Sequence, residues 1–245
     1  RERFTLDAGL SRAVREVFVT LFEDGLVYRG DRLINWCVHC RTALSDQEVE
    51  YRERAGTLYH LRYGVVTVAT VRPESKLGDT GLAVHPDDAR YRHLVGQTLT
   101  VPTESGTLDL PVVADTAVDP AFGTGVVKVT PAHDPADWEM GQRHGLPLRT
   151  VIGIDGRMTA EAGRYAGLDR DECRRRIVED LRAAGLLERE EPYRHRVGEC
   201  YRCGEVVEPL VSPQWFVKIA PLAAPALAAV REDRTRFVPK HWENS

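Results

Sequence analysis

The sequence lacks the segments that would place a protein in or across a membrane. None of its apolar runs approaches the roughly 18 residues that a helix needs to span a bilayer. The first residues, Arg1 to Thr5, have no apolar stretch like that of a secretory signal. There is also no internal repeat and no low-complexity segment, which excludes a repeat array. We therefore expect a cytoplasmic globular protein with no membrane partner.

The sequence also lacks an excess of basic residues. Its 33 Lys and Arg residues are outnumbered by 37 Asp and Glu residues, which gives a net charge of −4. Composition alone therefore does not indicate a nucleic-acid partner, which would require a local basic patch. Arg194, Arg196 and Arg202 form one candidate cluster, although a solvated surface is the simpler interpretation. At 245 residues, the chain is long enough for one large domain or two modest ones.

Cysteine is scarce, and its spacing is more informative than its number. Five cysteines without an export signal argue against a disulfide framework. Four of them form two C-x-x-C pairs, Cys37 with Cys40 and Cys200 with Cys203. Two thiolates on one tight turn can both reach a tetrahedral Zn²⁺, so two such turns supply four ligands. We therefore expect a structural zinc site, which leaves no open position for catalysis.

Other interpretations of the cysteine pairs stay open. The thiols could be reduced and free of metal, or His39 or His195 could replace one cysteine as a ligand. A redox role is less favoured, because no βαβ pattern surrounds either pair. Since 200 − 40 − 1 = 159 residues separate the two pairs, the segment between them is expected to be an insertion that leaves and returns at the metal site.

Hydrophobic periodicity predicts a helix followed by a strand-rich body. Apolar residues from Leu10 to Phe22 recur at three- and four-residue spacing, with Thr5 or Asp7 as the cap and Gly25 as the terminator. From about residue 57 the period changes to two, which predicts short strands. These strands cover residues 57–63, 65–70, 98–101, 110–113 and 126–130. The pattern favours an α+β fold with a β-barrel over a doubly wound parallel sheet.

Two helices interrupt this strand-rich body. One begins with Asp134 as its cap, followed by Pro135, and ends near Gly145. The other covers about 169–185 and carries Cys173 on its apolar face, which predicts a buried core thiol. The Glu-rich residues 188–191 are expected to form a return connection between domains.

Four further motifs follow one another along the chain. They are W-C-V-H-C-R-T-A-L-S-D-Q-E-V-E-Y at 36–51, A-T-V-R-P-E-S-K-L-G-D-T at 69–80, F-G-T-G-V-V-K-V-T-P-A-H-D-P-A-D at 122–137 and P-Q-W-F at 213–216. In this order they resemble the start, the threonine-rich peptide, the second pocket wall and the exit segment of the editing insertion in valyl, isoleucyl and leucyl tRNA synthetases. Pro73-Glu74 and the stretch from Lys128 to Pro135 favour the valyl branch.

The resemblance implies hydrolysis of threonine from mischarged tRNA(Val), because a pocket built for valine cannot strongly reject an isostere that adds a hydroxyl. It implies that Asp134 anchors the α-ammonium group of the substrate, and that Thr70 positions water or supports the ester carbonyl. Asp137 is our hypothesis for the group that binds the threonine hydroxyl. Lys128 and Thr130 would fill the polar wall, and the terminal adenosine and acyl group would be lined by Arg72, Ser75 and Phe122.

Several of these residues also have a structural interpretation. Asp134 and Asp137 sit where a capping box would place them, and one carboxylate oxygen can cap while the other faces the pocket. Phe122 without the resemblance would be a core residue. His133 is a tempting base, but a lone histidine beside a cap is more often structural. Residues 123–125 precede a strand, which predicts a turn. Because no Ser/His/Asp arrangement is present, we expect direct attack by water.

The sequence departs from the family pattern at two positions. Val71 stands where the family usually has a second threonine, and Ser75 replaces the last one; only Ser75 keeps a hydroxyl. The rate or selectivity of editing could therefore differ.

The nucleotide-binding signatures H-I-G-H and K-M-S-K-S are absent from these 245 residues. The resemblance thus implies a monomeric piece of a larger enzyme, which cannot activate an amino acid without the synthetic core. The expected division is a helical stub at 1–33, a zinc-binding root at 34–55 and 192–220, an editing domain at 56–191, and a segment leading back to the core at 221–245. Two alternatives remain: an isoleucyl-type domain that clears valine from tRNA(Ile), and a zinc-ribbon RNA-binding module without hydrolysis.

Overall fold

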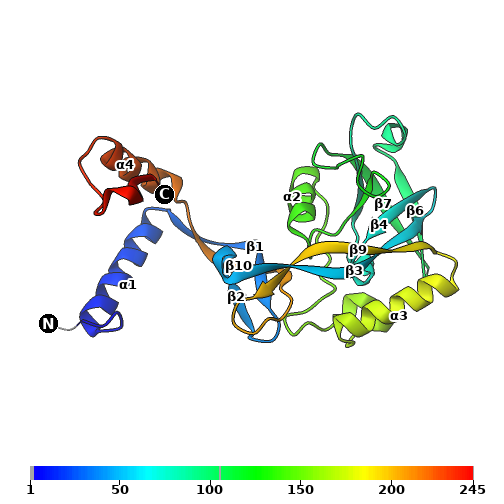
Figure 1. Cartoon of the computed structure of the whole chain (residues 1–245), viewed down its shortest axis with the longest axis horizontal. Coiled ribbons are helices and arrows are strands. Elements are labelled where there is room, and N and C mark those ends of the chain that lie inside the picture. The colour runs from blue at the N-terminus through cyan, green and yellow to red at the C-terminus, as the bar shows by residue number, and fades with distance from the viewer. Residues whose placement is uncertain (1–2, 105, 245) are drawn as a thin grey trace. The chain divides into compact units, whose positions relative to one another are not determined.

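The computed structural model describes residues 3–104 and 106–244 (Figure 1). These residues form two compact units. One comprises the residues up to Arg32 together with those from Ser212 onward, and the other comprises Leu33–Val211. Helices and strands are mixed along the chain, which confirms the α+β class. Within the described residues, no helix is long and apolar enough to cross a membrane.

In its described residues the smaller unit contains three helices: α1 (Ala8–Glu23), α4 (Ala220–Arg231) and the short 3₁₀ helix η5 (Lys240–Asn244). The predicted N-terminal helix is thus confirmed. Asp7 lies at its N-cap position, but its side chain makes no cap hydrogen bond and instead accepts one from the N–H of Phe4 at 3.2 Å. Gly25 follows the helix with a φ of 68°, which glycine adopts without strain.

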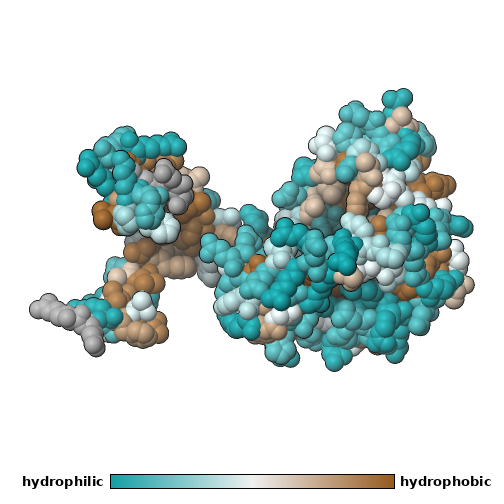
Figure 2. Space-filling view, in the orientation of Figure 1, coloured by the Kyte–Doolittle hydropathy of each residue, from teal (hydrophilic) through white to brown (hydrophobic). Residues whose placement is uncertain are grey.

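The apolar face of α1 is exposed. No residue of α1 is buried, and Val14, Val17 and Phe22 are each more than half exposed. Phe18 and Phe22 meet the ring of Trp215 edge-on, with ring centres 5.3 and 6.1 Å apart. Figure 2 shows brown, hydrophobic surface on this unit. The hydrophobic periodicity thus predicts the helix correctly. The apolar face of α1 is nevertheless not buried by any of the described residues.

The strands form three sheets. In one, β3 (Val49–Tyr63) pairs antiparallel with both β4 (Val66–Thr70) and β9 (Leu187–Cys200). A second sheet has the order β6 (Thr98–Thr103), β7 (Gly106–Ala114), β5 (Gly81–Val84) and β8 (Val126–Val129), with β5 and β7 parallel. The third has the order β10 (Glu208–Val217), β1 (Val27–Cys37) and β2 (Thr42–Leu44). None of these sheets closes on itself among the described residues, so the predicted barrel is not confirmed.

The β3–β9 ribbon is much longer than the sequence suggested. Its pairs run from Val49 with Cys200 to Leu61 with Leu187, so the predicted strand at 57–63 is only the second part of β3. The Glu-rich residues 188–191 belong to β9, so the segment where a connection was expected is part of a strand. The physical reason is cross-strand pairing, because Glu188 accepts from Arg62 and Glu191 contacts His60. The other four predicted strands correspond to β4, β6, β7 and β8.

Helix α3 (Arg170–Ala183) contributes one side of the main core. Asp169 caps it, with Oδ1 accepting from the N–H of Asp171 at 2.9 Å. Cys173, Ile177 and Leu181 are fully buried. They pack in one core with residues of the β4-β3-β9 sheet and of the four-stranded sheet. Burial raises the pKa of Cys173 to about 12, so this cysteine is the predicted core thiol and stays protonated at neutral pH.

Candidate functional site

A cavity of about 510 Å³ lies in the larger unit, where β4, β8 and α2 (Pro135–His144) meet. Every non-metal site residue proposed from the sequence lines it. These residues are Thr70, Arg72, Ser75, Phe122, Lys128, Thr130, Asp134 and Asp137. The lining also includes residues that the sequence did not indicate, among them Asp119, Met140 and Tyr193. Segments that are far apart in the sequence therefore converge on one cavity.

The wall formed by β8 is a closed set of hydrogen bonds. The ammonium group of Lys128 donates to Ser75 Oγ at 2.9 Å, to Asp79 Oδ1 at 3.1 Å and to Thr130 Oγ1 at 2.7 Å. The hydroxyl of Thr130 donates to Asp79 Oδ1 at 2.7 Å, and that of Ser75 to the carbonyl of Arg72 at 2.9 Å. Because all three N–H donors of Lys128 are used, its ammonium group holds the wall together.

Asp79 lies at the centre of this set, and the sequence reasoning missed it. Its side chain is fully buried and also accepts from the hydroxyl of Tyr63 at 2.6 Å. Asp79 falls inside the motif at 69–80, but the site residues predicted from that motif are Thr70, Arg72 and Ser75. A buried carboxylate needs a partner of opposite charge. The signal in the sequence is therefore the pairing of a carboxylate in this motif with a lysine or arginine elsewhere in the chain.

The start of α2 places two carboxyl groups at the cavity. Asp134 caps the helix as predicted, because its Oδ1 accepts from the N–H groups of Ala136 at 2.9 Å and Asp137 at 3.1 Å. Pro135 occupies the first turn, and Gly145 ends the helix in the left-handed conformation. Among the described residues, Oδ2 of Asp134 has no hydrogen-bond partner. One oxygen therefore caps the helix and the other remains free at the cavity.

Asp137 is buried beneath this cap. Its Oδ2 accepts from the N–H of Thr130 at 2.8 Å. Burial and the nearby charge of Asp134 raise the pKa of Asp137 to about 7, against the opposing effect of Lys128. At neutral pH the carboxyl group can therefore either donate or accept a hydrogen bond, which suits a ligand hydroxyl.

We expect Asp137→Asn to change how stability depends on pH. Because the folded pKa of about 7 lies above the ordinary value of 3.8, the folded chain keeps a proton that the unfolded chain releases. This carboxyl group therefore costs stability as pH rises from about 4 to about 7, by up to about 1.4 kcal/mol per pH unit. Urea titrations at both ends of that range should show a smaller fall in the free energy of unfolding for the variant. An equal fall in both proteins would mean that Asp137 titrates at its ordinary pKa.

Thr70 and Phe122 line the cavity from two different segments, β4 and the turn that precedes β8. Oγ1 of Thr70 accepts from the N–H of Arg72 at 3.0 Å, which leaves the hydroxyl hydrogen available to a ligand. Phe122 is 45% exposed and meets the ring of Tyr193 at 6.3 Å, so it lines the cavity and is not a core residue. Gly123 follows in the predicted turn with a φ of 58°.

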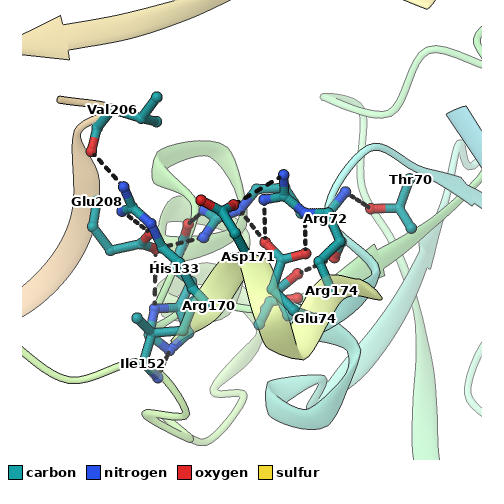
Figure 3. A network of polar contacts seen from close by, with 12 residues as sticks. Thr70, Arg72, Glu74, His133, Ile152, Arg170, Asp171, Arg174, Val206 and Glu208 are labelled. Carbon is teal, nitrogen blue, oxygen red and sulfur yellow. Dashed lines mark hydrogen bonds and ion pairs between the residues drawn. The ribbon is translucent and has the colours of Figure 1, made fainter. Parts of the chain in front are cut away.

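Arg72 is held by acceptors from three parts of the chain (Figure 3). It donates to Glu74 at 3.1 Å, to the carbonyl of His133 at 3.1 Å and to Glu208 at 2.6 Å. Burial alone would lower the pKa of Arg72, but the two carboxylates raise it. The sequence predicted Arg72 as a cavity residue, but it gave no sign of Glu208, which lies 136 residues away.

The two buried carboxylates each bind a second guanidinium group (Figure 3). Glu74 accepts from Arg174 at 2.8 Å through both oxygens, and Glu208 accepts from Arg170 at 3.0 Å. Burial would raise the pKa of Glu74, yet Arg174 and Arg72 lower it to about 2. This network fixes the orientation of Arg72 at the cavity edge.

His133 has the structural role that its position suggested. Its Nε2 accepts from the N–H groups of Val151 at 2.9 Å and Ile152 at 3.3 Å. Burial and the charge of Arg72 lower the pKa of His133 to about 3, so the ring stays neutral. A ring nitrogen already occupied by two backbone donors is poorly placed to act as a base.

The two cysteine pairs come together in the larger unit. The sulfur atoms of Cys37, Cys40, Cys200 and Cys203 all lie within 4.8 Å of one another. Sulfur ligands at about 2.3 Å from a tetrahedral zinc ion would be about 3.8 Å apart, so the four cysteines fit a metal ion. Burial raises the pKa of Cys200, but the backbone N–H groups of Arg202 and Cys203 outweigh it and lower this pKa to about 7. Within the described residues, neither His39 nor His195 belongs to the group.

Comparison with known proteins agrees with the motifs. Residues 1–245 match the family described as tRNA synthetases class I (I, L, M and V). The chain is 56% identical over 252 residues to the valine–tRNA ligase of Geobacter sulfurreducens, covering 100% of this chain and 28% of that protein. It is 54% identical to the valine–tRNA ligase of Symbiobacterium thermophilum, with 99% and 27% covered. It is 52% identical to that of Thermotoga maritima, with 99% and 28% covered.

The chain thus spans little more than a quarter of the length of these curated relatives. Its whole length lies within the matched family, and the eight cavity residues that the sequence predicted come from the motifs at 69–80 and 122–137. The chain therefore belongs to the class I tRNA synthetase family (I, L, M and V), in which these three relatives are valine–tRNA ligases.

Proposed function

We propose that this chain carries the editing site of a valine–tRNA ligase and hydrolyses the threonyl ester of mischarged tRNA(Val). The convergence of eight motif residues on one cavity of about 510 Å³ carries this proposal. A site that accepts threonine and excludes valine needs polar groups that pair with the hydroxyl of threonine. When valine enters, these groups lose water without gaining a partner, which is costly.

The two carboxyl groups at the start of α2 recognise the amino acid in this proposal. The free Oδ2 of Asp134 binds the α-ammonium group through a charge-assisted hydrogen bond. Asp137, whose pKa is about 7, binds the side-chain hydroxyl of threonine. Lys128 and Thr130 hold the polar wall in place, and Arg72, Ser75 and Phe122 surround the terminal adenosine.

The proposed reaction is direct attack of water on the ester carbonyl. The water oxygen bonds to the carbonyl carbon, the bond from that carbon to the ribose oxygen breaks, and the ribose oxygen takes up a proton. The Thr70 hydroxyl, which has its hydrogen available, orients the water or the carbonyl. Ser75 is not a suitable nucleophile, because its Oγ is held between Lys128 and the carbonyl of Arg72.

The test is release of threonine from Thr-tRNA(Val) by the purified chain, with Val-tRNA(Val) as the control. We expect release from the threonyl substrate only. Release from both substrates at one rate would contradict the proposed selectivity. If neither is hydrolysed, Val71→Thr tests whether the missing hydroxyl is the cause, and an inactive variant would count against an editing site in this chain.

We also propose that the four cysteines bind one structural Zn²⁺. In this proposal residues 34–55 and 192–220 form the zinc-binding root of an editing domain at 56–191. The remaining segments, 1–33 and 221–245, connect the root to the synthetic core of the whole enzyme.

Removal of the metal is expected to destabilise the larger unit. Because metal-binding free energy adds to folding free energy, a chelator should lower the midpoint of thermal unfolding by about 10 °C or more. Metal analysis should find one zinc ion per chain, and Cys37→Ser should lower the zinc content well below one ion per chain. Cys173→Ser is the matched control, because Cys173 lies in the core and should leave the zinc content unchanged. A midpoint that does not respond to the chelator would contradict a structural metal.

A further inference from the structure

A smaller cavity, of about 220 Å³, lies in the larger unit. None of the described residues lines both this cavity and the first. Its walls are formed by the 3₁₀ helix η2 (Pro73–Gly78), the hairpin of β6 and β7, the 3₁₀ helix η4 (Ala160–Tyr165) and Arg149. The proposed hydrolysis makes no use of this smaller cavity, although η2 also carries Ser75, which lines the first cavity.

Lys76 lines the smaller cavity and is buried without a hydrogen-bond partner. The residue is 1% exposed, and its Nζ has no acceptor among the described residues. Nζ lies 3.7 Å from the centre of the Tyr63 ring. Burial lowers the pKa of Lys76 to about 8, against the opposing charges of Asp79 and Glu104. The ammonium group brings three N–H donors into the interior and uses none of them in a hydrogen bond, which calls for an acceptor.

A second buried donor belongs to the same lining. Nε of Arg149 has no hydrogen-bond partner in the described part of the chain. The carboxylate of Glu161 lies 3.7 Å from it, which is beyond hydrogen-bonding distance. A third cation of the lining, Arg164, is already paired with Asp180 at 2.7 Å. Two cations thus have donors to spare, and one ligand carboxylate offers acceptors for both.

Carboxylates also line the smaller cavity, and they argue against a simple anion as its ligand. The charges of Glu104 and Glu161 balance those of Lys76 and Arg149, so an added anion would enter a lining with no excess of positive charge. A ligand that carries both charges avoids this cost. Its carboxylate can bind the two cations, and its ammonium group can bind Glu161, whose side chain is 64% exposed.

The volume and the remaining lining suit one small molecule. At about 30 Å³ for each water, a cavity of about 220 Å³ holds roughly seven waters, or a ligand of about eight non-hydrogen atoms. Leu77, Leu108 and Ala162 form an apolar stretch of the lining, against which an alkyl group would be removed from water. Paired cations, a carboxylate and an apolar contact in so small a space are what a free α-amino acid requires.

We propose that the smaller cavity binds a free α-amino acid with a small apolar side chain. The carboxylate of the amino acid accepts hydrogen bonds from Lys76 and Arg149. Its ammonium group donates to Glu161, and its side chain contacts the apolar stretch. The proposal goes beyond the proposed hydrolysis and does not depend on it, because the two cavities share no lining residue among those described.

Isothermal titration calorimetry of the full 245-residue chain with L-valine tests the proposal. Valine is the probe because it has the required size and because the first cavity is proposed to reject it. Two analogues each lack one charge: 3-methylbutanoate has no ammonium group, and 2-methylpropylamine has no carboxylate. We expect valine to bind, and each analogue to bind about tenfold more weakly or less. Equal affinity for 3-methylbutanoate or for inorganic phosphate would overturn the proposal, as would a chain that binds no valine.

Variants locate the bound valine. Lys76→Met and Glu161→Gln each remove one partner and should each weaken valine binding about tenfold. If Lys76→Met does not fold, Glu161→Gln decides, because it changes an exposed side chain. Glu179→Gln is the matched control, since it removes the same charge from an exposed position of α3 that lines neither cavity.

One further variant separates the two cavities. Asp134→Asn removes the proposed ammonium anchor of the first cavity and should leave the affinity for valine unchanged. A loss of binding in this variant would place valine in the first cavity and overturn the proposal. Equal weakening by Glu161→Gln and Glu179→Gln would also overturn it, because the effect would then be one of net charge and not of a site.

Discussion

Replacing Asp134 with alanine is expected to slow the release of threonine from Thr-tRNA(Val) by about a hundredfold or more. In the proposed function, the free Oδ2 of Asp134 binds the substrate's α-ammonium group at the cavity. Loss of a charge-assisted hydrogen bond that positions the ester is worth about 3 kcal/mol, which corresponds to this factor. Single-turnover deacylation measures the loss directly, since the chain needs no other substrate for this step.

Asp134 also caps α2, so the loss of the cap must be separated from the loss of the anchor. Asp134→Asn retains a capping oxygen but no charge, and it should be as inactive as the alanine variant while keeping normal stability. Asp169→Ala is the matched control, because it removes the corresponding cap of α3 at a residue that does not line the cavity. It should cost about 1 kcal/mol of stability and leave deacylation intact. If the Asp134→Asn variant is active, Asp134 serves only as a helix cap and does not bind the α-ammonium group.

The largest expected loss of stability follows from Lys128→Met. Asp79, whose side chain is fully buried, would lose its only ion pair in the structure's described part. An uncompensated charge in such a position typically costs about 3 to 5 kcal/mol. Urea unfolding should show this loss as a lower midpoint with an unchanged slope. Adding Asp79→Asn should recover part of it, because the amide is neutral, and a loss below about 1 kcal/mol would contradict the ion pair.

Lys76 provides the control for this prediction. It is as buried as Lys128, but its Nζ has no hydrogen-bond partner among the described residues and lies 3.7 Å from the centre of the Tyr63 ring. Burial lowers the pKa of Lys76 to about 8, against the opposing effect of the charge of Asp79. Lys76→Met should therefore change stability by about 1 kcal/mol or less, since the lost ring contact is offset by removal of a buried charge.

The sequence predicted the local features of the site well, because they depend on neighbouring residues. The cap at Asp134, the end of α2 at Gly145 and the buried face of α3 follow from spacing within one or two turns. The family motifs supplied eight of the residues that line the first cavity.

The interactions between distant segments could not be predicted in this way. Glu208 binds Arg72 across 136 residues, and Asp79 binds Lys128 across 49, yet neither pairing leaves a periodic signal in the sequence. The β9 strand was missed for the same reason, since its glutamates are stabilised by residues of β3 that lie more than 120 positions earlier. The barrel was inferred from the density of short strands, which does not determine whether a sheet closes.

The β3–β9 ribbon also constrains the order in which the chain folds. Leu61 pairs with Leu187, 187 − 61 = 126 residues later, and at the other end Val49 pairs with Cys200. Contacts of such sequence separation form late, because the entropy of closing the loop is lost before they contribute. We therefore expect folding of the enclosed residues to bring the Leu61 end together first, after which the ladder extends toward the cysteines. Capture of the proposed metal ion would then be the last step of folding and not its nucleus.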